Sequence, residues 1–212
     1  MLAWIGKHGM VTTDQISKRF FATATSKRRA HKRLEILEEM RLVHRDKTNF
    51  WRAPWIVRVT QAGADVGEIG LRPARLVEGE VRHAVALVDL VEQLAASTEG
   101  STLRTEREIR TDRWHQRKDG NLRPGRGRTP DGELTLSDGR VVAVELDLTP
   151  KRSKDFERIL RSYRQERFDR VWWYVVPGAL PRVTKLVNDN RCEDFIEVRP
   201  WHDPAEAAPE EH

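Results

Sequence analysis

The residues best suited to chemistry in this sequence are three carboxylates, found within and just before a predicted β-hairpin. In the segment VVAVELDL (141–148), side chains alternate between two faces, so Glu145 and Asp147 share one face of a strand. Two carboxylates on one face of so apolar a strand are unusual. Asp131 follows Pro130 and precedes the other strand of the hairpin.

The loop between the two strands decides whether these carboxylates meet. A two-residue loop would mix apolar and acidic side chains on one face of the hairpin. A three-residue loop with a left-handed Gly139 would instead pair Leu134 with Val142. The same register brings Asp131 opposite Glu145. Because only this second register keeps the apolar side chains together, we predict that the three carboxylates cluster.

Three clustered carboxylates need a cation, a proton or a nearby Lys or Arg. We therefore predict that Asp131, Glu145 and Asp147 bind Mg²⁺ or Mn²⁺, which would activate water for phosphodiester hydrolysis. The same three residues form the candidate catalytic set. The alternative is an acidic strand end that is only ion-paired, with candidate partners Arg140, Lys151 and Arg152.

A second set of residues with functional potential is a run of cations in the N-terminal third. Residues 26–40 predict a helix, because their apolar residues recur at helical spacing. Its first two turns carry five cations: Lys27, Arg28, Arg29, Lys32 and Arg33. The segments LVHRD and PWIVRVT after it favour a β-hairpin, whose polar tip contains Lys47 and Arg52.

Two predicted helices precede the basic helix, one at 2–7 and one capped by Thr12 or Thr13. The order helix, helix, basic helix, hairpin indicates a winged helix-turn-helix, whose third helix enters the major groove of double-stranded DNA. We therefore predict DNA binding through these seven cations. Residues 1–78 contain 15 Lys and Arg against 8 Asp and Glu, which agrees with a polyanionic partner. A merely solvated helix face and a protein-interaction module are the alternatives.

Composition restricts the class of protein further. The 212 residues are 38% hydrophobic and 33% charged, which favours two modest cores over one large core. No apolar run is long enough to span a membrane, and a single cysteine, Cys192, excludes a disulfide framework. The first residues, MLAWIGKHGM, lack the pattern of a signal peptide. We expect a cytoplasmic protein that does not contact a membrane.

The rest of the chain predicts a second α+β domain with the order αβββαβ. One strand is expected in LRTEREIRT, a basic loop at 117–128, and a helix at 153–168. The expected segments are a winged helix at 1–70, a linker at 71–79, the second domain at 80–203 and an acidic, disordered tail at 204–212.

Three motifs resemble the N-terminal domain of the replication-relaxation family of bacterial plasmids and integrative elements. They are T-x-x-Q-I in VTTDQISKRFF, R-L-x-x-L-x-x-x-x-L-V in RAHKRLEILEEMRLVHR, and V-T-x-x-G in VRVTQAGADV. The resemblance spans about residues 3–180. It implies a role in plasmid replication, relaxation or transfer, with other replication or transfer proteins of the element as partners.

The second domain resembles the restriction-endonuclease-like PD-(D/E)XK fold, through its element order, Pro130-Asp131 and Glu145-x-Asp147. That family normally has Lys two positions after the Glu, to position water or stabilise charge, whereas this chain has Asp147. The departure leaves two hypotheses. One is an active Mg²⁺-dependent nicking endonuclease assisted by Lys151. The other, which the missing lysine favours, is a degenerate site on a fold used for homodimerisation, DNA scaffolding or transcriptional control.

Overall fold

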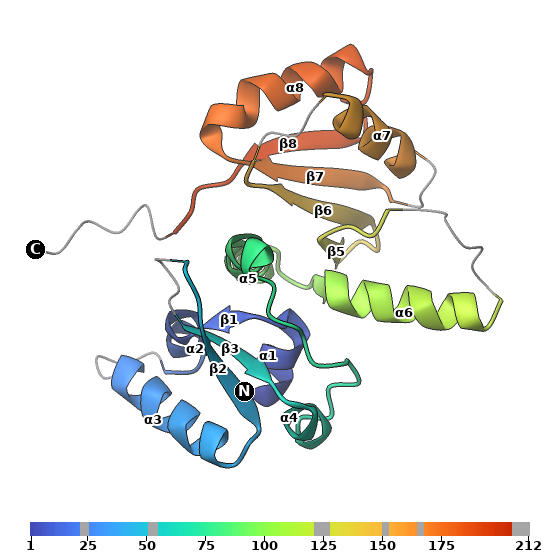
Figure 1. Ribbon diagram of the computed structural model, residues 1–212. Coiled ribbons are helices and arrows are strands. Elements are labelled where there is room, and N and C mark those ends of the chain that lie inside the picture. Colours follow the sequence, from blue (N-terminus) through green and yellow to red (C-terminus); the bar gives the residue numbers. More distant parts are fainter. Residues whose placement is uncertain (22–25, 51–54, 121–127, 150–152, 165–167, 205–212) are drawn as a thin grey trace, which may run out of the picture. The chain divides into compact units, whose positions relative to one another are not determined.

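The computed structural model describes residues 1–21, 26–50, 55–120, 128–149, 153–164 and 168–204. The chain forms two compact units, Met1–Leu90 and Val91–His212 (Figure 1). Both contain helices and strands, so the α+β class expected from the sequence is confirmed. The division falls within one helix, α5 (Glu78–Ser97).

The first unit combines helices with a three-stranded antiparallel sheet of order β1-β3-β2. Before α5 its elements are α1 (Leu2–His8), β1 (Val11–Thr12), α2 (Thr13–Phe20), α3 (Ser26–Glu39), β2 (Val43–Lys47), β3 (Trp55–Val59) and α4 (Gln61–Val66). The predicted basic helix and the hairpin after it are therefore confirmed as elements. Ala30 and Leu34 of α3 are fully buried in the core of this unit.

The T-x-x-Q-I motif forms a reciprocal capping box at the start of α2. The Gln15 backbone N–H donates to Thr12 Oγ1, and the Thr12 N–H donates to Gln15 Oε1, both at 3.0 Å. These bonds satisfy backbone donors that a helix start leaves unpaired. Gln15 Nε2 also donates to the carbonyl of Val85 at 2.8 Å, so the motif links α2 to α5.

The V-T-x-x-G motif forms a close backbone approach. The Thr60 hydroxyl accepts from the Gly63 N–H at 2.9 Å, and it donates to the Arg41 carbonyl at 2.7 Å. A Cβ atom on Gly63 would lie 1.9 Å from the carbonyl oxygen of Leu42. Only glycine fits at this position without backbone movement.

The second unit contains a five-stranded sheet of order β4-β5-β6-β7-β8. Its first three strands pair antiparallel and its last three parallel. Its elements after α5 are β4 (Thr102–Thr105), α6 (Glu106–Lys118), β5 (Gly132–Thr135), β6 (Val141–Asp147), α7 (Ser153–Tyr163), β7 (Arg170–Val175), a 3₁₀ turn (Pro177–Ala179), α8 (Leu180–Asp189) and β8 (Ile196–Pro200). Helices α7 and α8 lie over one face of the sheet (Figure 1). Phe156 of α7, Trp173 of β7 and Val183 of α8 are buried in one hydrophobic cluster.

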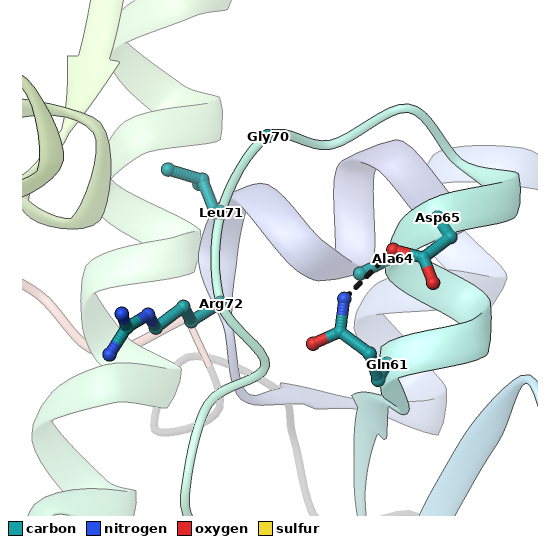
Figure 2. Close-up of a pocket in the computed structure, with 6 residues that line it drawn as sticks. All are labelled: Gln61, Ala64, Asp65, Gly70, Leu71 and Arg72. Atoms are coloured by element: carbon teal, nitrogen blue, oxygen red, sulfur yellow. Dashed lines mark hydrogen bonds between the residues drawn. The ribbon is translucent and has the colours of Figure 1, made fainter.

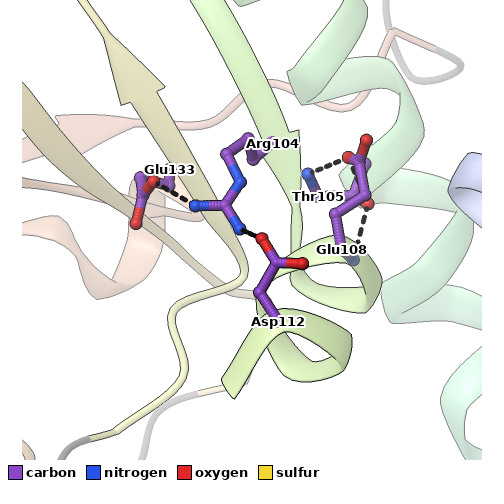
Figure 3. A network of polar contacts seen from close by, with 5 residues as sticks. All are labelled: Arg104, Thr105, Glu108, Asp112 and Glu133. Atoms are coloured by element: carbon purple, nitrogen blue, oxygen red, sulfur yellow. Dashed lines mark hydrogen bonds and ion pairs between the residues drawn. The ribbon is translucent and has the colours of Figure 1, made fainter. Parts of the chain in front are cut away.

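Helix α6 corrects the predicted order αβββ. The sequence predicts one strand through LRTEREIRT, but β4 ends at Thr105 and a helix begins at Glu106. A second capping box starts this helix: the Thr105 N–H donates to Glu108 Oε2 at 2.7 Å, and the Glu108 N–H to Thr105 Oγ1 at 3.5 Å (Figure 3). The T-x-x-E pattern of the segment thus favoured a helix start over a longer strand.

An arginine fixes α6 against the sheet. Arg104 of β4 donates through Nη1 to Glu133 Oε1 of β5 at 2.9 Å. Its Nη2 pairs with Asp112 of α6, so one guanidinium joins two strands and the helix (Figure 3). Ile109 of α6 is 2% exposed and supplies the apolar anchor of the helix.

The predicted register of the β5–β6 hairpin is confirmed. Leu134 pairs with Val142, and Gly139 has a φ of 86°, in the left-handed region. The Leu136 N–H donates to the Arg140 carbonyl at 2.9 Å, which leaves a three-residue loop. This register keeps Asp131 and Glu145 on one face of the sheet.

Several predicted features lie outside the described residues. They are Arg52 at the hairpin tip, Lys151, residues 121–127 of the basic loop and the tail from residue 205. Helix α7 ends at Tyr163, earlier than the predicted end at 168. Among the described residues, no helix has both the length and the apolar character that crossing a bilayer requires.

We predict that Gly63→Ala lowers the free energy of unfolding of the first unit by about 1–3 kcal/mol, because the new methyl group overlaps the Leu42 carbonyl. Urea denaturation of the full chain measures this effect. The matched control is Gly79→Ala in α5, where a Cβ meets no atom within 4 Å and alanine favours the helix. Equal effects of the two substitutions would contradict the packing argument.

Candidate functional site

One face of α3 carries the cations predicted to bind DNA. Lys27, Arg28, Arg29, Lys32 and Arg33 are all exposed, as are His31, Glu35, Ile36, Glu38 and Glu39 of the same helix. Lys27 Nζ lies 3.3 Å from Asp14 Oδ1, but both side chains are exposed, so this ion pair is weak. The opposite face of α3 is anchored in the core, so the helix presents its positive charge to solvent.

The end of the β2–β3 hairpin adds a cation and an exposed indole. Lys47 ends β2, is exposed, and pairs in register with Trp55, the first residue of β3. The Trp55 side chain is 43% exposed, and the Arg45 guanidinium lies 5.7 Å from its ring centroid. Trp55 is not among the residues predicted to bind DNA, although an aromatic residue beside a predicted basic tip is a signal for such a site.

The three predicted carboxylates are all buried in the second unit. Glu145 is 0% exposed and lies within β6, and Asp147 is the last residue of that strand. Asp131 immediately precedes β5, and its Oδ2 accepts the Leu146 N–H at 2.8 Å. The structure thus places Asp131 against β6 and next to the position of Glu145 in the hairpin.

Glu145 is held by two residues that sequence analysis did not assign to the site. Arg128 forms a bidentate pair with it: Nε donates to Oε1 at 3.0 Å and Nη2 to Oε2 at 2.9 Å. The Tyr163 hydroxyl at the end of α7 also donates to Oε1. The carboxylate therefore joins the segment before β5, strand β6 and helix α7.

The buried cluster shifts the acid–base properties of its members. Burial, followed by the charge of Asp131, raises the pKa of Glu145 to about 7, although Arg128 and Tyr163 oppose this shift. Burial and the charge of Glu145 raise the pKa of the Tyr163 hydroxyl above its usual value. Burial lowers the pKa of Arg128, but the hydrogen bond and the charge of Glu145, together with the nearby Tyr163 and Asp131, outweigh burial and raise that pKa above its usual value.

This arrangement does not fit a divalent metal ion as it stands. Mg²⁺ and Mn²⁺ need oxygen ligands, and both oxygens of Glu145 already accept hydrogen bonds from a guanidinium. Among the described residues, no group of three or more His, Cys, Asp and Glu side chains is placed to hold an ion. Metal binding by Asp131, Glu145 and Asp147 therefore stays a prediction.

The sequence also allowed an acidic strand end that is only ion-paired. The structure does pair Glu145 with a cation, but not with one of the three that were expected. Arg140 pairs with Asp138, with 2.7 Å between Nε and Oδ2, and Lys151 and Arg152 lie outside the described residues. Arg128 is the partner of Glu145. In the sequence it was only the last residue of the predicted basic loop. Tyr163 had a usable signal, because a hydroxyl on an apolar helix face requires a hydrogen-bond partner.

The first unit has a small pocket of about 180 Å³ that lacks this chemistry (Figure 2). Its lining residues are Gln61, Ala64, Asp65, Gly70, Leu71 and Arg72. Gln61 Nε2 donates to Asp65 Oδ1 at 2.8 Å, so these two polar groups satisfy each other. The candidate sites are therefore the basic face of α3 and the buried carboxylate cluster.

The chain matches a known protein family. The sequence profile described as replication-relaxation matches residues 2–175. This range covers most of the chain and includes α3, the β2–β3 hairpin and all three carboxylates. No curated protein and no solved structure matches the chain.

We predict that wild-type protein loses stability relative to Glu145→Gln as pH rises from 4.5 to about 7. The folded protein holds a proton on Glu145 more tightly than the unfolded chain does, so raising the pH favours unfolding. The relative loss is up to about 3 kcal/mol for this shift. Urea denaturation at several pH values measures the difference in free energy of unfolding between wild type and Glu145→Gln. The control is Glu157→Gln, which shows the effect of removing a carboxyl group from the surface. A pH-independent difference would contradict the assignment.

Proposed function

Because the chain belongs to the replication-relaxation family, whose description indicates a role in DNA replication or relaxation, we propose that it is a cytoplasmic DNA-binding protein of a mobile genetic element. Its first unit acts as a winged helix-turn-helix that docks on double-stranded DNA. Its second unit is a PD-(D/E)XK-like fold without metal-dependent activity. The protein serves replication, relaxation or transfer of the element together with other proteins encoded there.

The basic face of α3 carries this proposal. Five exposed cations occupy a helix whose opposite face, with Ala30 and Leu34, is fully buried. The order α1, β1, α2, α3, β2, β3 supports a winged helix, in which this helix enters the major groove. Contacts between these cations and phosphates supply most of the affinity, so binding weakens steeply as salt increases.

The β2–β3 hairpin is the wing in this proposal. Lys47 at its end supplies a phosphate contact, and Arg52 adds another from outside the described residues. Trp55, opposite Lys47, offers an apolar surface to the sugar–phosphate backbone. These contacts position the domain on DNA and do not themselves select a base sequence.

The Arg128–Glu145 pair supports a degenerate nuclease fold in the second unit. Where a nuclease would hold a cation between carboxylates, a guanidinium neutralises Glu145. A metal-dependent nicking endonuclease is the second candidate, because Asp131 and Glu145 interact closely enough for one charge to raise the other's pKa. In that case Asp131, Glu145 and Asp147 would bind Mg²⁺ or Mn²⁺, with assistance from Lys151. A winged-helix regulator or protein adaptor is the remaining alternative.

We predict that Arg28→Glu/Arg29→Glu lowers affinity for duplex DNA, because it removes two phosphate contacts and adds repulsion. Fluorescence anisotropy with a labelled duplex at several salt concentrations measures this. The slope of log affinity against log salt should become shallower by about two units. The control, Arg158→Glu/Arg161→Glu, makes the same charge change at two exposed positions of α7. Unchanged binding by the α3 variant would exclude this docking, as would an equal loss in the control.

We predict that the protein does not nick supercoiled plasmid in Mg²⁺ or Mn²⁺, because Arg128 occupies the Glu145 oxygens. Gel electrophoresis measures conversion to the open circle. Nicking that stops with EDTA and in Glu145→Gln would establish the endonuclease instead. Tyr163→Phe controls for loss of folding, because it removes one hydrogen bond from the site while keeping all the carboxylates.

A further inference from the structure

Helix α6 has one anchored face and one basic, aromatic face. Ile109 faces the core and is 2% exposed, whereas Trp114 is 52% exposed. Arg110, Arg117 and Lys118 are also exposed and lie three or four positions from Trp114. Residues at this spacing are neighbours on a helix surface, so three cations surround the indole.

Packing does not account for Trp114. Its ring contacts the adjacent His115 edge-on, with 4.9 Å between ring centroids. The Lys118 ammonium lies 5.4 Å from the indole centroid, a cation–π contact that is weak in solvent. Trp and Arg are enriched among the residues that supply binding energy at interfaces, so an exposed indole among cations is a candidate binding surface.

Positive charge is in excess on this side of α6. Glu106 pairs with Arg110, with 2.6 Å between Oε1 and Nη2. Arg107 lies one turn before Arg110, and burial followed by the charge of Arg110 lowers its pKa. Such crowding of like charges is relieved when a polyanion binds.

We propose that this face of α6 binds single-stranded DNA, with Trp114 stacking on a base and Arg110, Arg117 and Lys118 contacting phosphates. A duplex hides the flat faces of its bases inside the stack, whereas an unpaired strand exposes them to an indole. Indole and cations together therefore fit a single strand better than a duplex. The inference rests on the proposed function, because it assumes that the chain acts on DNA.

This face is rigidly connected to the buried carboxylate cluster. Arg113, next to Trp114, donates through Nη1 to the backbone carbonyl of Arg128 at 2.9 Å. The guanidinium of Arg128 binds Glu145, and Arg104 fixes α6 to β5. A single strand on α6 is thus held by an element with fixed supports within its own unit, as a specific binding surface requires.

Fluorescence anisotropy of the full chain with labelled oligothymidylate tests the proposal. We expect Trp114→Ala to weaken binding about tenfold, and Trp114→Phe to retain most of the affinity because phenylalanine also stacks. Arg117→Glu/Lys118→Glu should weaken binding and make its salt dependence shallower. Unaltered affinity in both Trp114→Ala and Arg117→Glu/Lys118→Glu would overturn the proposal.

Two further arms separate this surface from α3 and from other partners. Duplex binding should be unchanged in Trp114→Ala, whereas Arg28→Glu/Arg29→Glu should weaken duplex binding and leave oligothymidylate binding intact. If wild-type protein binds oligothymidylate but not the duplex, the proposed docking of α3 is wrong and the proposed α6 surface is supported. The protein could instead bind vesicles that contain phosphatidylglycerol, in a way that requires Trp114, and fail to bind oligothymidylate. That result would identify a membrane surface as the partner of α6 and overturn the proposal.

Discussion

A carboxylate without access to water organises the second unit. Glu145 is fully buried in β6, and an isolated charge there would be costly unless donors surround it. Arg128 and Tyr163 supply those donors, so one side chain joins the segment before β5, the central strand and α7. Removing one partner would leave a buried charge or a buried donor, and each element would lose part of its support. The carboxylate cluster is thus a structural joint, whatever chemistry it has.

Apart from Arg33, the motif residues by which the chain resembles its family differ from those proposed to act on DNA. Thr12 and Gln15 form a capping box, and Gly63 permits a close backbone approach. All three maintain the fold of the first unit and are buried or half-buried. The cations of α3, in contrast, are exposed and contribute little to packing. Family membership therefore supports the fold of the site more directly than it supports a particular ligand or reaction.

Periodicity and turn chemistry were sufficient to predict much of this structure. Face consistency selected the register of Leu134 with Val142, because a one-residue slip would have exposed apolar side chains. The sequence did not indicate where β4 ends. Alternating side chains in LRTEREIRT favour a longer strand, whereas a capping box at Thr105 in the same segment favours a helix. Nor did it identify Arg128 as the partner of Glu145. Their pairing joins residues 17 positions apart that no local pattern connects.

Helix α5 has a consequence for how such chains diversify. Val81 and Val88 pack into the cores of the first unit, whereas Val91 and Leu94 are buried beyond the division at residue 90. The boundary is therefore a continuous helix with apolar residues on both sides. A recombination breakpoint inside α5 would separate the two parts of the helix. Each part would then lack the turns that complete the hydrophobic face of α5. Exchange of the first unit between related genes must therefore carry the whole of α5 with it or match its apolar pattern.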